Sequence, residues 1–108
     1  DKQFDVIFYA QSWHFINDFQ KALKEAERVL KSDGIVAILE PSENSRNWAS
    51  PKLRRGSKEF DEIAFQKKLL DLERGRRAIF NQNLFEVVED EYDARTTSYF
   101  YVLKKSNV

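Results

Sequence analysis

The most constraining feature of this sequence is an amphipathic helical pattern between two short, almost wholly apolar segments. FDVIFYA, residues 4–10, is rich in β-branched and aromatic side chains, which predicts a strand covered on both faces. GIVAILE, residues 34–40, has the same character. Between them, apolar residues recur at helical spacing at Phe15, Phe19, Ala22, Leu23, Ala26 and Leu30. This order predicts a βαβ unit with two parallel strands.

Capping residues predict where this helix begins and ends. Asn17 is placed to cap its N-terminus, with Gln20 three residues later as in a capping box. Lys31 and Gly34 are placed to close the C-terminus, because a cation suits that end of a helix and glycine suits the turn after it.

The rest of the chain predicts a long loop, a second helix and a hairpin. Residues 41–57 hold both prolines and no periodicity, which indicates either a binding loop or a mobile surface excursion. Ser57 is placed to cap a second helix that ends near Gly75 or one turn later. Residues 85–92 and 97–104 read as strands of an antiparallel hairpin, so the predicted fold class is α/β.

Composition narrows the possible functions. The 18 Lys and Arg residues balance the 18 Asp and Glu residues, which weighs against nucleic acid and anionic membranes as partners. The chain has no cysteine, which excludes a disulfide framework and a thiolate metal site, and we expect no metal. No apolar run approaches the roughly 20 residues that span a bilayer, and no signal-peptide pattern is present. Cytoplasmic localisation is therefore the default expectation.

The element order and two local strings resemble the second half of class I S-adenosylmethionine-dependent methyltransferases. FDVIFYAQSWHF, followed by E-x-x-R-V-L-K-x-x-G-I-V over residues 25–36, is similar to that family's fourth strand, next helix and fifth strand. Ala10-Gln11-x-x-His14-Phe15 is similar to a variant found in methyltransferases of small organic acids. Ser32-Asp33 stands where the family usually has Pro-Gly, a departure that concerns the subfamily more than the fold.

This resemblance implies the C-terminal half of a Rossmann-like methyltransferase sheet, with S-adenosyl-L-methionine as cofactor and a small molecule as methyl acceptor. The family's glycine-rich cofactor loop has no counterpart here, because Gly34, Gly56 and Gly75 are isolated. The chain also begins without methionine and enters a strand at once. We therefore expect residues 1–108 to be a fragment of one methyltransferase domain, inactive alone, whose partner is a missing N-terminal half.

Candidate cofactor and catalytic residues follow the first predicted strand. Ligands of open α/β sheets bind beyond the carboxyl ends of the strands, and the family places its post-strand-four residues at the methionine end of the cofactor. Ala10, Gln11 and Ser12 are the residues at that place. His14, the only histidine, is the catalytic candidate for proton transfer, although it could instead orient the loop or bind the acceptor.

Five residues are candidates for binding the acceptor, each with a plainer alternative. Trp13 could line the acceptor pocket or belong to the core, and Trp48 could close over a substrate or anchor the loop. Glu40 could face the acceptor or hold a loop. Arg54 and Arg55 could clamp a carboxylate or phosphate through their planar guanidinium groups, or lie in a solvated basic loop.

Two other functions stay open at this point. One is a non-catalytic, methyltransferase-like module that binds a partner chain, and the other is an RNA or protein methyltransferase with the same cofactor. In the intact family fold the strand at residues 4–10 pairs with the first strand of the sheet. Without that neighbour it becomes an exposed apolar edge, so we expect self-association through residues 4–10.

Overall fold

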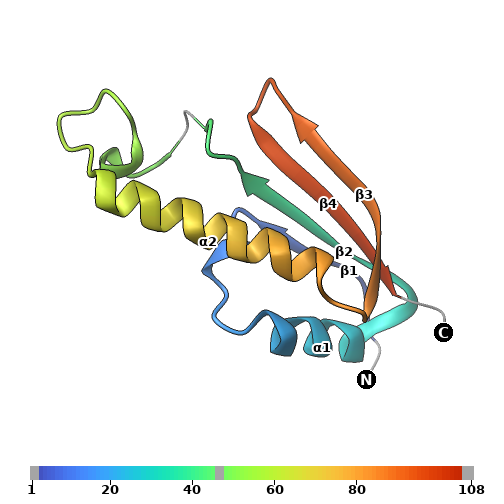
Figure 1. The fold of residues 1–108 in the computed structure, drawn as a ribbon. Coiled ribbons are helices and arrows are strands. Elements are labelled where there is room, and N and C mark those ends of the chain that lie inside the picture. Colours follow the sequence, from blue (N-terminus) through green and yellow to red (C-terminus); the bar gives the residue numbers. More distant parts are fainter. Residues whose placement is uncertain (1–2, 46–47, 106–108) are drawn as a thin grey trace.

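The computed structural model describes residues 3–45 and 48–105 as a four-stranded sheet with two helices on one face (Figure 1). The elements are β1 (Phe4–Ala10), the 3-10 turn η1 (Trp13–Phe15), α1 (Phe19–Val29), β2 (Leu30–Pro41), the 3-10 turn η2 (Pro51–Leu53), α2 (Glu62–Phe80), β3 (Phe85–Asp93) and β4 (Ser98–Lys105). The predicted α/β class, with a βαβ unit, a helix and a hairpin, is confirmed. Among these residues, no helix combines the length and apolar character that a membrane span requires.

The sheet has the strand order β1-β2-β4-β3. β1 and β2 are parallel, as the helix between them requires, and Tyr9 stands opposite Ile38. β4 runs antiparallel to both β2 and β3, with Tyr101 opposite Ile38 on one side and Asp90 on the other. The carboxyl ends of β1 and β2 consequently lie at the same edge of the sheet.

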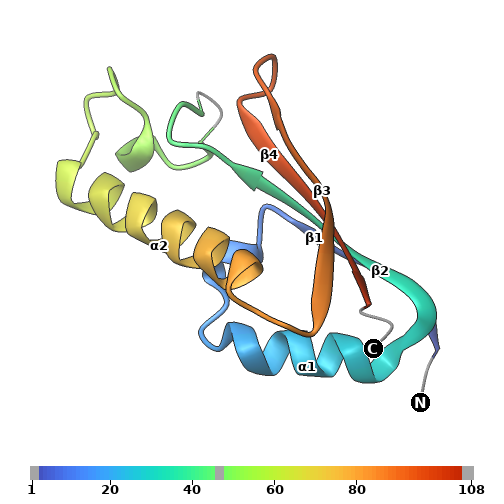
Figure 2. The ribbon, with the colours of Figure 1, turned by 45° about the vertical axis from the view of Figure 1, so that its right-hand side comes forward.

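The hydrophobic core lies between one face of the sheet and the two helices (Figure 2). Alternate residues of β2 and β4 point into it because side chains of a strand alternate between faces. The helical spacing seen in the sequence places one face of α1 against them. The central members are Trp13, Phe19, Leu23, Ala26, Leu30, Val36, Ile38, Ile79, Phe85, Tyr101 and Leu103.

The expectation that residues 4–10 are covered on both faces is wrong for the described chain. β1 is an edge strand, and Phe4, Val6 and Phe8 are 49%, 51% and 57% exposed. The reason is that both helices pack on the opposite face, so the side chains that alternate away from the core meet no described element. Ala37 of β2, by contrast, is buried between two neighbouring strands.

The predicted boundaries of the first helix need two corrections. Asp18, not Asn17, caps α1, and its carboxylate accepts a hydrogen bond from Lys21 N at 3.0 Å. Gly34 does not form a turn, because β2 begins at Leu30 directly after the helix. A Cβ atom at position 34 would lie 2.8 Å from Leu30 Cδ2, so packing is what requires glycine there.

The second helix begins later than predicted, and its end at Phe80 agrees with the later of the two predicted ends, about one turn beyond Gly75. Asp61 caps α2 by accepting from the backbone N–H groups of Ile63 and Ala64 at 3.0 and 3.2 Å. The Ser57 hydroxyl instead bonds Glu59, and Ser57 lies five residues before the first residue of α2. Gly75 lies inside α2, which continues to Phe80.

Replacing Asp61 with alanine is expected to lower the free energy of unfolding by about 1 kcal/mol, the usual cost of losing an N-cap. Ser57→Ala is the matched control and should change it by less than about 0.5 kcal/mol, because Ser57 caps no helix. Urea denaturation followed by circular dichroism measures both. The reverse ranking would restore Ser57 as the helix cap.

Candidate functional site

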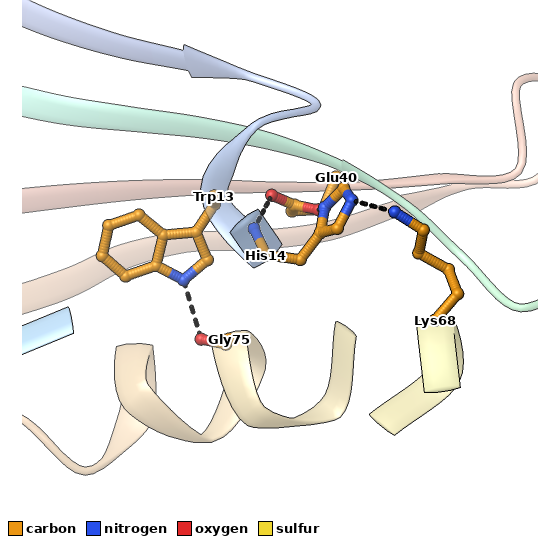
Figure 3. A network of polar contacts seen from close by, with 5 residues as sticks. All are labelled: Trp13, His14, Glu40, Lys68 and Gly75. Atoms are coloured by element: carbon orange, nitrogen blue, oxygen red, sulfur yellow. Dashed lines mark hydrogen bonds and ion pairs between the residues drawn. The ribbon is translucent and has the colours of Figure 1, made fainter. Parts of the chain in front are cut away.

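The candidate site lies at the edge of the sheet where β1 and β2 both end. β1 ends at Ala10, and the Gln11 N–H donates to Leu39 O of β2 at 2.7 Å. Gln11 has a φ of 58°, in the left-handed region, which turns the chain sharply away from the strand. This turn brings η1, with Trp13 and His14, between the sheet and α2 (Figure 3).

Ala10, Gln11 and Ser12 are all exposed at this edge. The Ser12 side chain makes no capping hydrogen bond to η1. Gln11 adds an exposed side-chain amide next to the Ser12 hydroxyl. Hydroxyl and amide groups can pair with the amino and carboxylate groups of a methionine moiety. The cofactor-binding role of Ala10, Gln11 and Ser12 stays a prediction.

His14, Glu40 and Lys68 form a buried polar network beside these residues (Figure 3). Glu40 Oε1 accepts from the His14 backbone N–H at 3.0 Å, and Glu40 Oε2 lies 2.5 Å from His14 Nδ1. Lys68 Nζ of α2 lies 3.1 Å from His14 Nε2. His14 is 3% exposed and Glu40 6%, so η1 and β2 are joined through buried side chains, and the half-buried Lys68 adds α2 to the network.

The geometry of this network favours a neutral imidazole. When Nδ1–H donates to the Glu40 carboxylate, Nε2 carries a lone pair and accepts from the Lys68 ammonium. A doubly protonated ring would point an N–H at the ammonium group. Burial lowers the pKa of Lys68, while the carboxylates of Asp71 and Glu40 oppose that shift. Lys68 Nζ also lies 4.0 Å from the centre of the Phe15 ring, a cation–π contact.

Trp13 lies in the core and has no exposed surface. Its Nε1–H donates to Gly75 O at 2.8 Å, which satisfies the indole while it is buried. A Cβ atom at position 75 would lie 3.0 Å from Trp13 Cδ1, so the glycine allows this close approach. Tyr9 and Phe19 pack against the indole with ring centroids 5.1 and 5.0 Å away.

The other predicted acceptor residues lie in the loop before α2. Trp48 is half-buried with its ring 5.9 Å from Lys68 Nζ, and its Nε1 has no hydrogen-bond partner among the described residues. The Arg55 guanidinium lies 4.6 Å from the centre of the Phe65 ring. Arg54 and Arg55 border an open hollow that also contains Arg95 of the β3–β4 turn.

The structure therefore divides the predicted site residues into separate groups. It brings His14 and Glu40 into direct contact and places Trp48 near them through Lys68. It sets Arg54 and Arg55 in the hollow by the hairpin turn. Lys68 and Arg95 were not predicted, because neither position belongs to a motif and only the packing of α2 and the hairpin reveals them.

A second titratable cluster, centred on Tyr101, leads to a prediction on pH. Burial raises the pKa of Tyr101 to about 12, although the hydrogen bond from Arg76 opposes the shift. Because the folded pKa exceeds the unfolded value of about 10, stability from this group is intact below pH 10 and is lost as pH rises to about 12. We expect a loss of about 1–2 kcal/mol after solvent screening.

Urea denaturation at pH 9 and pH 12 measures this loss, and Tyr101→Phe should reduce it. Tyr92→Phe is the control, since Tyr92 is 43% exposed. An equal pH dependence in the wild type and Tyr101→Phe would contradict the assignment.

Comparisons with known proteins agree with this fold. A family model described as a methyltransferase domain matches residues 1–38. A crystal structure from Sulfolobus solfataricus, provisionally described as a type 11 methyltransferase, aligns over 100% of this chain with a TM-score of 0.59 and 21% sequence identity. The chain spans 53% of that protein's length. No curated protein matches significantly. The two matches confirm the resemblance to class I S-adenosylmethionine-dependent methyltransferases, and the structural one shows the shared fold.

Proposed function

We propose that this chain carries the acceptor side of a cytosolic S-adenosylmethionine-dependent methyltransferase that acts on a small molecule. The observation that carries the proposal is the buried His14–Glu40–Lys68 network directly beside exposed Gln11 and Ser12. It lies at the carboxyl ends of two parallel strands, where open α/β sheets bind ligands. The family match to residues 1–38 includes Ala10, Gln11, Ser12 and His14.

The chemistry asks little of the protein beyond positioning. The cofactor, when bound, supplies a methyl group already activated on a sulfonium, and the protein orients the acceptor and excludes water. Ala10, Gln11 and Ser12 would hold the methionine end of the cofactor. The rest of the cofactor site, including a glycine-rich loop, would come from an N-terminal half that precedes residue 1 in the intact protein.

The contacts of His14 favour positioning among its three possible roles. Both ring nitrogens are engaged, Nδ1 by Glu40 and Nε2 by Lys68. Proton transfer from an acceptor would require Nε2 to release Lys68 first. We therefore assign His14 the role of holding η1, and with it Gln11 and Ser12, against β2. Catalytic proton transfer is the alternative, which a pH profile of kcat would detect.

Calorimetric titration with S-adenosylhomocysteine tests the proposed function. This chain alone should bind weakly or not at all, whereas the product of the complete gene should bind with a measurable Kd. In that product Gln11→Ala should weaken binding about fivefold, the value of roughly 1 kcal/mol for one polar contact. Gln20→Ala is the matched control, because Gln20 is an exposed glutamine that lies on α1 instead of at the end of a strand.

Failure of the complete gene product to bind S-adenosylhomocysteine would overturn the proposed function. Tight binding by this chain alone would overturn the idea of a split cofactor site. Equal losses in Gln11→Ala and Gln20→Ala would remove Gln11 from the site.

The exposed edge of β1 favours a second candidate function, a partner-binding module. β1 pairs on one side only, and Val6 and Phe8 are half-exposed on its uncovered face. An unpaired apolar edge readily accepts another strand. We predict that the chain dimerises through residues 4–10 and that Phe8→Lys shifts it toward monomer by at least tenfold in Kd.

Sedimentation equilibrium measures the dimer and its loss. Leu70→Lys is the matched control, since Leu70 is 65% exposed on α2, away from the edge strand. A monomeric wild type at high concentration would contradict the predicted self-association.

A further inference from the structure

A cavity of about 330 Å³ lies between α2 and the sheet, next to the candidate site. Its helical wall includes Leu69, Leu72 and Ile79, and its sheet wall includes Tyr99 and Tyr101 of β4. The cavity forms because α2 packs on η1 and not directly on the sheet. Trp13 and His14 of η1 lie between α2 and the sheet (Figure 3). Its volume falls in the range of about 300–1,000 Å³ typical of small-molecule pockets.

The lining of the cavity suits a largely apolar molecule with an aromatic ring. The rings of Tyr99 and Tyr101 are stacked, 9° apart with centroids separated by 6.1 Å, and the Arg76 guanidinium lies 4.8 and 5.6 Å from their centres. Leu69 and Leu72 of α2 add aliphatic groups to the lining. An aromatic ring between the helical wall and the sheet wall would bury its apolar surface against aliphatic and aromatic side chains.

The charged residues of the cavity determine which polar group a bound molecule should carry. Glu40 and Glu43, at the β2 end, offer carboxylate oxygens, which accept hydrogen bonds and donate none. Glu73, the third carboxylate of the lining, is paired with Arg77 at 2.7 Å. Each Glu40 oxygen takes one bond from His14 and keeps further lone pairs. The one cation of the lining, Arg76, is engaged by the Tyr101 hydroxyl and lies 4.8 Å from the Tyr99 ring centre.

We propose that this cavity binds a planar, largely apolar small molecule whose hydroxyl or amine group points to the carboxylates of Glu40 and Glu43. The inference deepens the proposed function, on which it rests for one point only: under that function, this donor group is the methyl acceptor. Binding itself requires neither cofactor nor transfer. Glu40 then links the acceptor to His14 and so to the residues that follow β1.

Calorimetric titration with 2-naphthol as probe tests the site. Binding by the wild-type chain should saturate with one molecule per chain. Leu72→Trp, which fills the cavity, should weaken it at least tenfold. Leu70→Trp makes the same change on the same helix outside the cavity and should leave the Kd within twofold. Circular dichroism confirms that both variants fold, and Tyr99→Ala replaces Leu72→Trp if the latter does not.

Two further probes test the required donor group. 2-Methoxynaphthalene keeps the ring but has no hydroxyl proton, and should bind at least fivefold more weakly. 2-Naphthoate carries an anion toward the carboxylates and should bind at least tenfold more weakly. Equal binding of all three probes would overturn the assigned chemistry, and naphthol binding that Leu72→Trp leaves unchanged would overturn the site. Naphthol binding together with no S-adenosylhomocysteine binding by the complete gene product would keep the site and remove the proposed function.

Discussion

Replacing Glu40 with alanine is expected to lower the free energy of unfolding by about 3 kcal/mol, the cost of leaving buried hydrogen-bond donors without their charged acceptor. Glu40 is the only acidic member of the network, and its loss leaves the His14 Nδ1–H and backbone N–H without acceptors. The Lys68 ammonium also loses an opposite charge while it remains half-buried. Urea denaturation followed by circular dichroism measures the effect.

Two further variants test whether the stability loss comes from the His14–Glu40–Lys68 network or from removing any carboxylate in this part of the chain. Glu43→Ala removes a carboxylate three residues away that is exposed, and should change stability by less than about 0.5 kcal/mol. The double variant His14→Ala with Glu40→Ala should cost less than the sum of the single variants, because the two residues act as one unit. Additive losses, or a Glu40→Ala cost under 1 kcal/mol, would contradict a coupled buried network.

The fold could be predicted because the buried faces of its helices and strands require apolar residues at regular spacing in the sequence. β2 and the α1 face emerged from their apolar spacing, and the hairpin from its alternation. The helix starts were misplaced because Asn17 and Asp18 are chemically equivalent caps, as are Ser57 and Asp61. Only the path of the incoming chain, which depends on distant packing, selects between such neighbours.

The candidate site could be predicted only in part. His14 and Glu40 were separate candidates, and their meeting follows from two parallel strands that end at one edge. Lys68 comes from α2, 54 residues after His14, and its position depends on how that helix lies across the sheet. Gly75 marked the earlier of two predicted helix ends, whereas in the structure it lies inside α2 and allows the close approach of Trp13. Contacts of this kind leave no periodic signal.

Replacing Trp13 with alanine is expected to cost about 3–5 kcal/mol, since the indole is fully buried and its removal opens a cavity at the junction of η1, α1 and α2. The Gly75 carbonyl also loses its side-chain donor. Trp48→Ala is the matched control and should cost less than about half as much, because Trp48 is half-buried and its Nε1 makes no described hydrogen bond. Equal losses of unfolding free energy in the two variants would contradict a special structural role for Trp13. A much larger loss at Trp13 would identify it as the residue that fixes α2 above the sheet, and therefore as the support of both the His14 network and the adjoining cavity.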